Sequence, residues 1–340
     1  METLDAIQEG FALPITEPSQ ASEARRIATR LATRFGFGET RAGEVALVAT
    51  EAATNLLKHA AGGMLVMRAL GSGSNHCVEI LALDHGPGVI DPEQCMVDGY
   101  STVSSPGTGL GAIRRLSTEF DFYSILTRGT VLFSRIWKID RPREAFDIGG
   151  IGVPKSGEMI CGDAWGSDIE GERLGVAVID GLGHGPDAAA ASHAALAVFR
   201  RSAGLSPAQI IERMHPALRS TRGAAIALAT INRDRGTVVY CGVGNISGTI
   251  LSAGRIQRMV SHNGTVGHAL RKVQEFHYTI QPNDLMVMHS DGISAGWTIE
   301  EYSGVLRHHP GILAASIYRD HCRGRDDATV VVVRPVRGEP

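Results

Sequence analysis

The sequence has few aromatic residues, no cysteine pairing pattern and no excess of either charge. Aromatic residues make up 5% of the 340 residues, and the five cysteines show no Cys-x-x-Cys spacing. Scattered cysteines in odd number argue against both a disulfide framework and a zinc site. The 33 Lys and Arg residues against 36 Asp and Glu give a net charge of −3. This balance provides no basic surplus for binding a nucleic-acid backbone.

Long hydrophobic runs are also missing. The longest stretch of small apolar residues, Ala188–Phe199, is broken by Ser192 and His193, whereas a membrane span needs about 20 apolar residues. The N-terminus shows no basic residues followed by an apolar run, so no secretory signal is expected. The sequence therefore predicts a cytoplasmic protein that contacts neither membrane nor nucleic acid.

The length and composition indicate two globular domains of mixed α+β class. Hydrophobic residues make up 43% of the chain, and a domain usually has about 100–200 residues. We expect an N-terminal domain over residues 1–138, a linker over 139–150 and a C-terminal domain over 151–340. In the first domain we expect helices over Ala24–Phe35, Glu39–His59 and Gly111–Phe120, and strands over Met64–Ala69, Cys77–Leu83 and Thr130–Trp137. In the second we expect a helix over Pro186–Arg201 and strands over Met159–Cys161, Leu174–Ile179, Ala224–Ile231, Thr237–Cys241, Gly248–Ser252, Leu285–His289 and Thr329–Arg334.

The helix predicted over Glu39–His59 carries a Glu-x-x-x-Asn pair. Residues four apart share a helix face, so Glu51 and Asn55 project together. An amide oxygen is a suitable Mg²⁺ ligand, and a carboxylate one turn away can act as a base. Taken alone, such a pair is more often solvated surface.

Two glycine-rich segments follow in the first half. Asp84 ends a predicted strand and precedes Gly86 and Gly88. A carboxylate there can accept a hydrogen bond from the exocyclic amine of adenine, while the glycines let the backbone pass close to the ring. The ordinary alternative is a turn.

The second segment, Gly-Thr-Gly-Leu-Gly at positions 107–111, opens a predicted helix. Free N–H groups at a helix N-terminus can hold an anion, although this is not a Walker A loop. The alternative is a flexible lid without a ligand.

In this order, and followed by Gly129-Thr130, these motifs resemble the GHKL (Bergerat) ATP-binding fold shared by gyrase, Hsp90, histidine kinases and MutL. Residues 19–137 carry the resemblance, and their flanking sequence is similar to the serine kinases that control bacterial sigma factors, the stressosome switch kinases. The resemblance implies an ATP-binding α/β sandwich in which Asn55 binds Mg²⁺, Glu51 is the catalytic base and Asp84 binds adenine. It also implies a pocket and lid formed by Gly86, Gly88, Gly107, Gly109, Leu110, Gly111 and Thr130.

Acidic residues lie at the ends of predicted strands in the second half. Asp163, Asp180 and Asp291 each follow an apolar run, and the pair Asp326-Asp327 precedes one. Carboxylates gathered at one sheet edge repel one another unless cations compensate them. All-carboxylate ligation favours Mg²⁺ or Mn²⁺, and two such ions can hold a hydroxide for attack on phosphorus. A single Asp-Gly, by contrast, is ordinarily a turn.

The segments Asp-Gly-Leu-Gly-His-Gly at 180–185, Ser-Asp-Gly at 290–292 and Arg-Asp-Asp-Ala-Thr at 325–329 resemble the metal-dependent serine/threonine phosphatases of the PPM superfamily. The resemblance covers residues 146–334 and is strongest to the bacterial SpoIIE-type branch, in particular the stressosome feedback phosphatases. It implies a PPM-type αββα sandwich holding two divalent ions.

The same resemblance assigns the metal ligands. Asp180 bridges both ions and has a catalytic role, the Gly181 carbonyl ligates one ion, and Asp291 and Asp326 complete the pair. Asp163 holds a metal-bound water, and Asp327 stays open as the alternative to Asp326. His184 is adjacent, and a role in helix entry or packing is at least as plausible there as acid catalysis.

Together these patterns predict a bifunctional signalling switch that uses ATP, Mg²⁺ and Mn²⁺. Its partner would be a phosphorylated STAS-type, anti-anti-sigma-like protein, and other sigma-factor regulators are further candidates. Two alternatives stay open for the first domain: a module that only binds ATP and a partner protein, and a simple nucleotide hydrolase.

Overall fold

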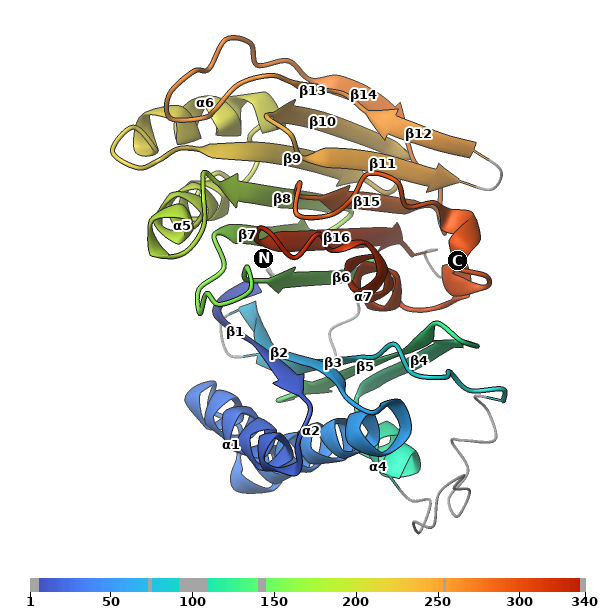
Figure 1. Ribbon diagram of the computed structural model, residues 1–340. Helices are drawn as coiled ribbons and strands as arrows, with labels where there is room; N and C mark the ends of the chain where they lie inside the picture. The colour runs from blue at the N-terminus through green and yellow to red at the C-terminus, as the bar shows by residue number, and fades with distance from the viewer. Residues whose placement is uncertain (1–5, 73–74, 92–108, 140–144, 253–254, 337–340) are drawn as a thin grey trace. The chain divides into compact units, whose positions relative to one another are not determined.

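The computed structural model describes residues 6–72, 75–91, 109–139, 145–252 and 255–336 (Figure 1). They form two compact units. The N-terminal unit contains Ile7–Pro142 together with Tyr302–Arg319, and the C-terminal unit contains Arg143–Glu301 and Asp320–Pro340. None of the described helices has the length and apolar character that a membrane-spanning helix requires.

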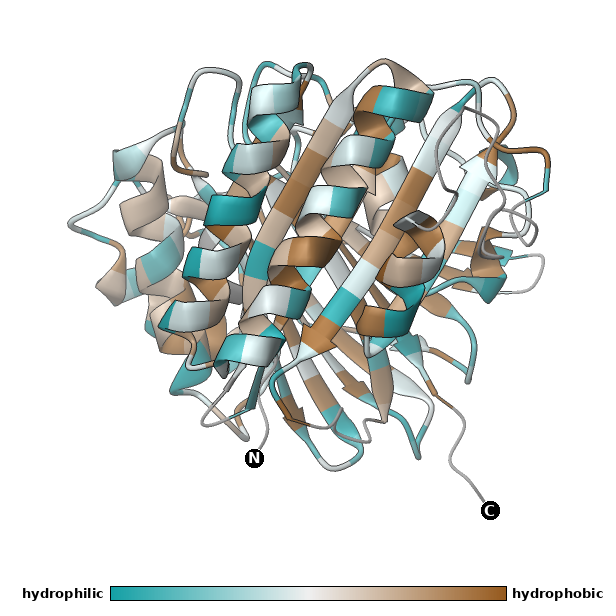
Figure 2. Ribbon diagram, turned by 90° about the horizontal axis from the view of Figure 1, so that it is seen from below, coloured by the Kyte–Doolittle hydropathy of each residue, from teal (hydrophilic) through white to brown (hydrophobic). Residues whose placement is uncertain are grey.

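The N-terminal unit is a five-stranded sheet with helices on one face (Figures 1 and 2). Its strands are β1 (Ala6–Ile15), β2 (Gly63–Ser72), β3 (Asn75–Leu83), β4 (Glu119–Ile125) and β5 (Gly129–Trp137), in the spatial order β1-β2-β3-β5-β4. The helices on this face are α1 (Pro18–Arg34), α2 (Glu39–Ala60) and α4 (Gly109–Leu116), and most of α7 (Pro310–His321) also belongs to the unit. Leu31 of α1, Val48 of α2 and Ile80 of β3 are fully buried in the core between helices and sheet. Burying a side chain of this size contributes about 1.5–3 kcal/mol.

One predicted helix of this unit ends earlier than expected. The expectation of helix up to Phe120 is wrong, because α4 ends at Leu116 and β4 begins at Glu119. The backbone leaves the helix at Thr118, whose N–H donates to the Arg135 carbonyl oxygen at 2.8 Å. Pairing with β5 therefore overrides the helical pattern.

The C-terminal unit contains two sheets. The first has the order β13-β10-β9-β8-β7, with β14 paired to β10, and the second has the order β12-β11-β15-β16-β6. The bounds are β6 Phe146–Val153, β7 Asp163–Glu170, β8 Arg173–Gly181, β9 Ala224–Asn232, β10 Thr237–Val243, β11 Ser247–Ser252, β12 Arg255–Met259, β13 Ser261–His262, β14 Phe276–Thr279, β15 Leu285–His289 and β16 Ala328–Pro335.

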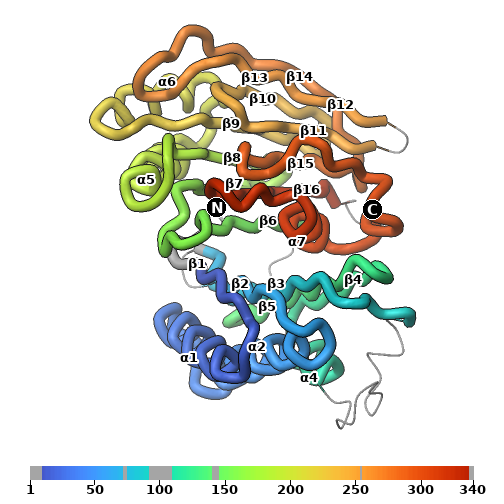
Figure 3. The backbone as a smooth tube through the Cα atoms, in the orientation of Figure 1, coloured from blue at the N-terminus to red at the C-terminus, as the bar shows by residue number. Residues whose placement is uncertain are grey.

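Two helices pack against the first of these sheets. Phe199 of α5 (Pro186–Arg200) and Met214 of α6 (Pro207–Ala217) lie in one apolar cluster with Ile226 of β9. After β15 the chain passes through two short 3₁₀ turns, η1 (Ile299–Glu301) and η2 (Val305–Arg307). It then enters α7 (Pro310–His321) before returning in β16, a path that can be followed in Figure 3.

Two expectations for this half are wrong. Part of the expected linker over 139–150 belongs to β6, which pairs along its length with β16. Gly150 in this strand is needed because a Cβ there would lie 2.8 Å from the Trp165 ring. The expected strand Met159–Cys161 is not formed either. These residues lie in bends before β7, which begins at Asp163, and the Met159 side chain is 94% exposed.

The segment Tyr302–Arg319 packs in the N-terminal unit, although the expected boundary assigns it to the C-terminal domain. The His309 ring stacks on Phe133 of β5 at 4.0 Å between centroids. Asp121 of β4 accepts hydrogen bonds from His308 Nδ1 at 2.8 Å and from the His309 N–H at 2.6 Å. These contacts join parts of the chain that no local pattern connects.

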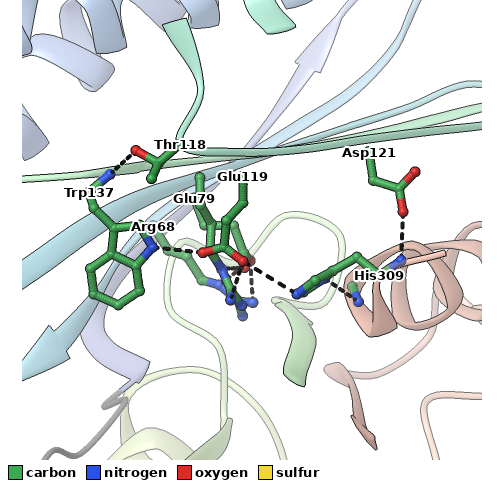
Figure 4. A network of polar contacts seen from close by, with 9 residues as sticks. Arg68, Glu79, Thr118, Glu119, Asp121, Trp137 and His309 are labelled. Atoms are coloured by element: carbon green, nitrogen blue, oxygen red, sulfur yellow. Dashed lines mark hydrogen bonds and ion pairs between the residues drawn. The ribbon is translucent and has the colours of Figure 1, made fainter. Parts of the chain in front are cut away.

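A buried polar network lies near this segment on β2, β3, β4 and β5 (Figure 4). Glu79 accepts from Arg68 Nε at 2.9 Å and from Arg135 Nε at 2.7 Å. Glu119 accepts from Trp137 Nε1 at 2.7 Å. Because buried charges are tolerated only when paired, the network fixes how these four strands pack.

We expect Asp121→Asn to lower the free energy of unfolding by about 2 kcal/mol, the scale of a charge-assisted hydrogen bond. Burial alone raises the pKa of Asp121, but hydrogen bonds from His308 and the His309 N–H outweigh it and lower the pKa. This carboxylate therefore stabilises the fold above its unfolded pKa of 3.8, and that stability is lost as the pH falls through the folded value. Urea unfolding at pH 7 and pH 3 tests this. An equal deficit for the variant at both pH values would contradict it.

Candidate functional site

Asp84 holds the turn after β3 in the N-terminal unit. Its Oδ1 accepts hydrogen bonds from the Gly86 N–H at 2.7 Å and the Thr130 N–H at 3.1 Å. Burial raises the pKa of Asp84, and these hydrogen bonds oppose the rise. Both described hydrogen bonds of this carboxylate reach Oδ1, so Oδ2 can accept from a ligand amine.

The neighbouring residues complete this turn. The Asp84 N–H donates to the Thr130 carbonyl at 3.0 Å, and the Thr130 hydroxyl lies 3.1 Å from that of Ser124. Gly88 follows in the same turn after β3. The structure thus brings Asp84, Gly86 and Thr130 together.

The Glu51–Asn55 pair of α2 faces the start of α4. A Cβ built on Gly109 would lie 2.8 Å from Glu51 Oε2 and 3.4 Å from Asn55 Oδ1. The first residues of α4 are therefore directly beside both side chains. Leu110 packs on the core, and Gly111 is buried. Gly107 lies outside the described residues.

Arg319 is a contributor to this region that the sequence analysis missed. Its Nη1 donates to the Asp84 carbonyl oxygen at 3.4 Å, across 235 positions of sequence. No local motif marks this residue, because the contact exists only once Tyr302–Arg319 has packed in the N-terminal unit.

In the C-terminal unit, Asp163 and Asp180 face each other across β7 and β8 as paired residues of the antiparallel ladder. Asp163 is buried, and the Ser290 hydroxyl donates to its Oδ2 at 2.6 Å. Burial raises the pKa of Asp163 to about 7. Burial, followed by the charges of Asp163 and Asp291, raises the pKa of Asp180 to about 9.

Asp291 and Asp326 lie at the neighbouring ends of β15 and β16. Asn245 Nδ2 donates to Asp291 Oδ2 at 2.7 Å. Burial raises the pKa of Asp291, and the charge of Asp326 adds to the rise. Both aspartates line a cavity of about 320 Å³ together with Ser294, Arg323 and Arg325.

The structure distinguishes the two adjacent aspartates. Asp327 is buried, and its Oδ1 accepts from the Lys155 N–H at 2.9 Å. Asp326 is half-buried and lines the cavity. Asp327 therefore anchors the backbone near Lys155, and Asp326 is the one directed to the cavity. His184 is an exposed residue whose Nδ1 lies 2.7 Å from Glu158 Oε1.

No three His, Cys, Asp or Glu side chains among the described residues are gathered closely enough to hold one metal ion together. Burial and the charges of neighbouring aspartates raise the pKa values of Asp180 and Asp291. Mg²⁺ commonly keeps several waters and takes only one or two carboxylates. An all-oxygen donor set of paired, mutually repelling carboxylates therefore fits two hydrated Mg²⁺ or Mn²⁺ ions.

We expect Mn²⁺ binding at pH 7 to release about one proton per protein molecule, because metal ligation requires deprotonated carboxylates. At pH 7 Asp180 holds a proton in the metal-free protein because its pKa is about 9, whereas Asp163, with a pKa of about 7, is only partly protonated. Their contribution to stability is full below the unfolded pKa of 3.8 and is lost as the pH rises through about 7 and about 9. Calorimetric titration in two buffers of different ionisation enthalpy measures the protons. Binding without proton release would contradict the expectation.

Comparison with known families matches each half separately. Residues 16–134 match the histidine kinase-like ATPase domain, and residues 170–336 match stage II sporulation protein E (SpoIIE). The serine/threonine-protein kinase RsbT of Bacillus subtilis (strain 168) is 30% identical over 114 residues, covering 34% of this chain and 86% of that protein. The chain belongs to the histidine kinase-like ATPases in its N-terminal half and to the SpoIIE family in its C-terminal half.

Further relatives agree with this fused architecture. The phosphoserine phosphatase RsbX of Bacillus subtilis (strain 168) is 28% identical over 163 residues, covering 45% of this chain and 82% of that protein. A solved structure described as "The bacterial stressosome: a modular system that has been adapted to control secondary messenger signaling" is 33% identical. It has a TM-score of 0.54 and covers 56% of this chain and 100% of its own. The predicted fold class, kinase-like ATPase followed by PPM-type phosphatase fold, is confirmed.

Two residues near the acidic site were not assigned a role from sequence. Asn245 orients Asp291, and Ser290 orients Asp163. Each lies in a short sequence motif that could have identified it. Asn245 ends Gly-Val-Gly-Asn at 242–245, and Ser290 begins Ser-Asp-Gly at 290–292. The SpoIIE-type half therefore carries a polar side chain beside at least two of its predicted ligand carboxylates.

Proposed function

We propose that the chain is a bifunctional switch that removes phosphate from a phosphoserine or phosphothreonine protein and transfers phosphate from ATP in the opposite direction. The observation that carries the phosphatase half is the set of aspartates gathered at the ends of β7, β8, β15 and β16. The raised pKa values of Asp163, Asp180 and Asp291 indicate a site built to be neutralised by cations.

In the proposed phosphatase site, Asp180, Asp291, Asp326 and the Gly181 carbonyl would hold two divalent ions. When bound, the ions neutralise charge on the phosphate and lower the pKa of water. Ser290 holds Asp163 in place, so that its carboxylate can orient a water, and Asn245 fixes the rotamer of Asp291.

In the proposed kinase site, Asp84 binds adenine through Oδ2, and Thr130, Gly86 and Gly88 shape that end of the pocket. Asn55 would hold Mg²⁺, and Glu51 would take the proton of the acceptor hydroxyl. Gly109 supports this assignment, since only a residue without Cβ lets α4 begin so close to Glu51 and Asn55. Gly107, Leu110 and Gly111 are proposed to complete the lid.

The proposed partner is a STAS-type, anti-anti-sigma-like protein, with other sigma-factor regulators as further candidates. The RsbT and RsbX relatives support a place in this class of pathway. We also propose a cytoplasmic location, because the described cysteines Cys77, Cys161, Cys241 and Cys322 form no disulfide with one another, as a reducing compartment favours.

Two assays with the whole chain test this function. Phosphate release from a phosphoserine STAS protein is expected with Mn²⁺ or Mg²⁺ and is expected to stop with EDTA. Labelled ATP is expected to phosphorylate the same protein in its unphosphorylated form. Release that continues in EDTA would overturn the metal mechanism. ATP binding without transfer would favour a regulatory binding module, and turnover of free ATP without an acceptor would favour a nucleotide hydrolase.

A further inference from the structure

The phosphatase half carries two arginines beside its carboxylates that the proposed site does not yet use. Arg323 and Arg325 line the cavity of about 320 Å³ that also contains Asp291 and Asp326. Both side chains are exposed. Within the part of the chain that the structure describes, neither guanidinium has an ion pair or a hydrogen bond with another residue.

The backbone holds these arginines close to the acids. The Arg323 N–H donates to the Gly292 carbonyl oxygen at 2.8 Å, directly after Asp291. One residue before Arg323, the backbone of Cys322 pairs with that of Ile293 in an isolated antiparallel β-bridge. Arg325 immediately precedes Asp326, whose Oδ1 accepts from the Asp327 N–H at 3.0 Å. Both guanidinium groups are thus tethered at the mouth of the acidic site.

A phosphate ester dianion meets an electrostatic barrier at this site. Asp291 and Asp326 line the cavity, and their carboxylates repel an approaching dianion. Arginine presents a planar fork of donors that matches phosphate oxygens, and such charge-assisted hydrogen bonds are stronger than neutral ones. Two unpaired arginines bordering the cavity supply the missing positive charge.

We propose that Arg323 and Arg325 bind the phosphoryl group of the substrate, a phosphoserine or phosphothreonine side chain, and hold it over the Asp291–Asp326 end of the site. The Ser294 hydroxyl lines the same cavity and can donate to a phosphate oxygen. This inference rests on the proposed phosphatase function and adds the residues that recognise its substrate.

The test compares Arg323→Ala, Arg325→Ala and the corresponding lysine variants with the whole wild-type chain. The substrates are p-nitrophenyl phosphate and a phosphoserine protein, each with Mn²⁺. We expect each alanine variant to raise KM about 10- to 100-fold for both substrates, the loss of one hydrogen-bonded charged pair. The lysine variants are expected to recover part of this loss, because they keep the charge but not the fork. Arg258→Ala, on exposed β12 of the same unit, is the matched control and should leave KM unchanged.

A second measurement does not depend on turnover. Inorganic phosphate binding to the Mn²⁺-loaded protein, followed by calorimetry, is expected to weaken by a similar factor in each alanine variant while Mn²⁺ affinity stays the same. Phosphate binding and KM equal to wild type in both alanine variants would overturn the inference. So would a KM rise confined to the protein substrate, which would show that the arginines contact the partner's surface instead. A wild-type chain that hydrolyses neither substrate with Mn²⁺ overturns the proposed function, whereas the phosphate titration still tests the arginines.

Discussion

Asp180→Asn is expected to reduce metal-dependent phosphate release by about 10³-fold or more. The proposed role of Asp180 as a shared metal ligand would support several kcal/mol of transition-state stabilisation, and each 1.36 kcal/mol is tenfold in rate. Burial, followed by the charges of the neighbouring aspartates, raises the pKa of Asp180 to about 9. It is also the residue that pairs with Asp163 across β7 and β8. The measurement is phosphate release from a phosphoserine protein over a range of Mn²⁺ concentrations.

The same variant has a second expected effect that separates loss of a ligand from loss of folding. Asp180 must take up a proton when the metal-free protein folds at pH 7, because its pKa rises from 3.8 to about 9. An amide needs no proton, so Asp180→Asn removes this cost and should raise the melting temperature of the metal-free protein. The control is Asp234→Asn, in the turn after β9, where the side chain is 66% exposed. It should change neither activity nor stability. Wild-type activity in Asp180→Asn would contradict the bridging role, and lost activity with a lowered melting temperature would indicate misfolding.

Glu51→Gln is expected to reduce phosphoryl transfer from ATP by about 10²- to 10⁴-fold, the contribution of a general base. Its ATP affinity should stay close to wild type, because the amide has the size of the acid. Asn55→Ala, one turn away on α2, is expected instead to weaken Mg²⁺-ATP binding itself. Transfer to a STAS-type acceptor and binding of a fluorescent ATP analogue separate the two effects.

Glu39→Gln is the matched control for this pair, since Glu39 is an exposed glutamate on the same helix, in its first turn. It should affect neither binding nor transfer. Undiminished transfer in Glu51→Gln would exclude Glu51 as the base. Strong nucleotide binding without transfer in the wild-type chain would assign the N-terminal half to binding only.

The sequence predicted β8, β15 and β16 of the acidic site because their apolar runs are short and sharply bounded, but it did not predict β7. The strand expected over Leu285–His289 is β15 with the same limits, and Asp291 follows it as expected. Strand pairing then brings distant acids together. Asp163 was predicted as a site residue for a wrong reason, since it begins β7 rather than following a strand.

Other elements were missed although a signal was present. Helix α6 begins with Ser206 and Pro207, and Gln209 completes a capping box with Ser206. A serine cap followed by proline is a recognisable helix start. Helix α1 likewise begins at Pro18, several residues before the apolar pattern that predicted it.

What no sequence pattern could provide is pairing between distant residues. Arg319 reaches the Asp84 carbonyl, and Asn245 reaches Asp291, only after strands from far apart in the chain have assembled. The early end of the predicted helix has the same cause. The Thr118 N–H donates to the carbonyl oxygen of Arg135, which lies in β5. Local propensity is overridden where a tertiary hydrogen bond competes with it.

The way Tyr302–Arg319 packs has a consequence for how this gene can be rearranged. The chain leaves the N-terminal unit at Pro142, returns at Tyr302 and departs again after Arg319. A recombination event that exchanged everything after Pro142 would also replace the histidines that pair with Asp121 and the serine whose carbonyl accepts from Tyr123. The C-terminal part of the chain therefore cannot be exchanged freely. A replacement is compatible with the N-terminal unit only if it contains a segment equivalent to Tyr302–Arg319.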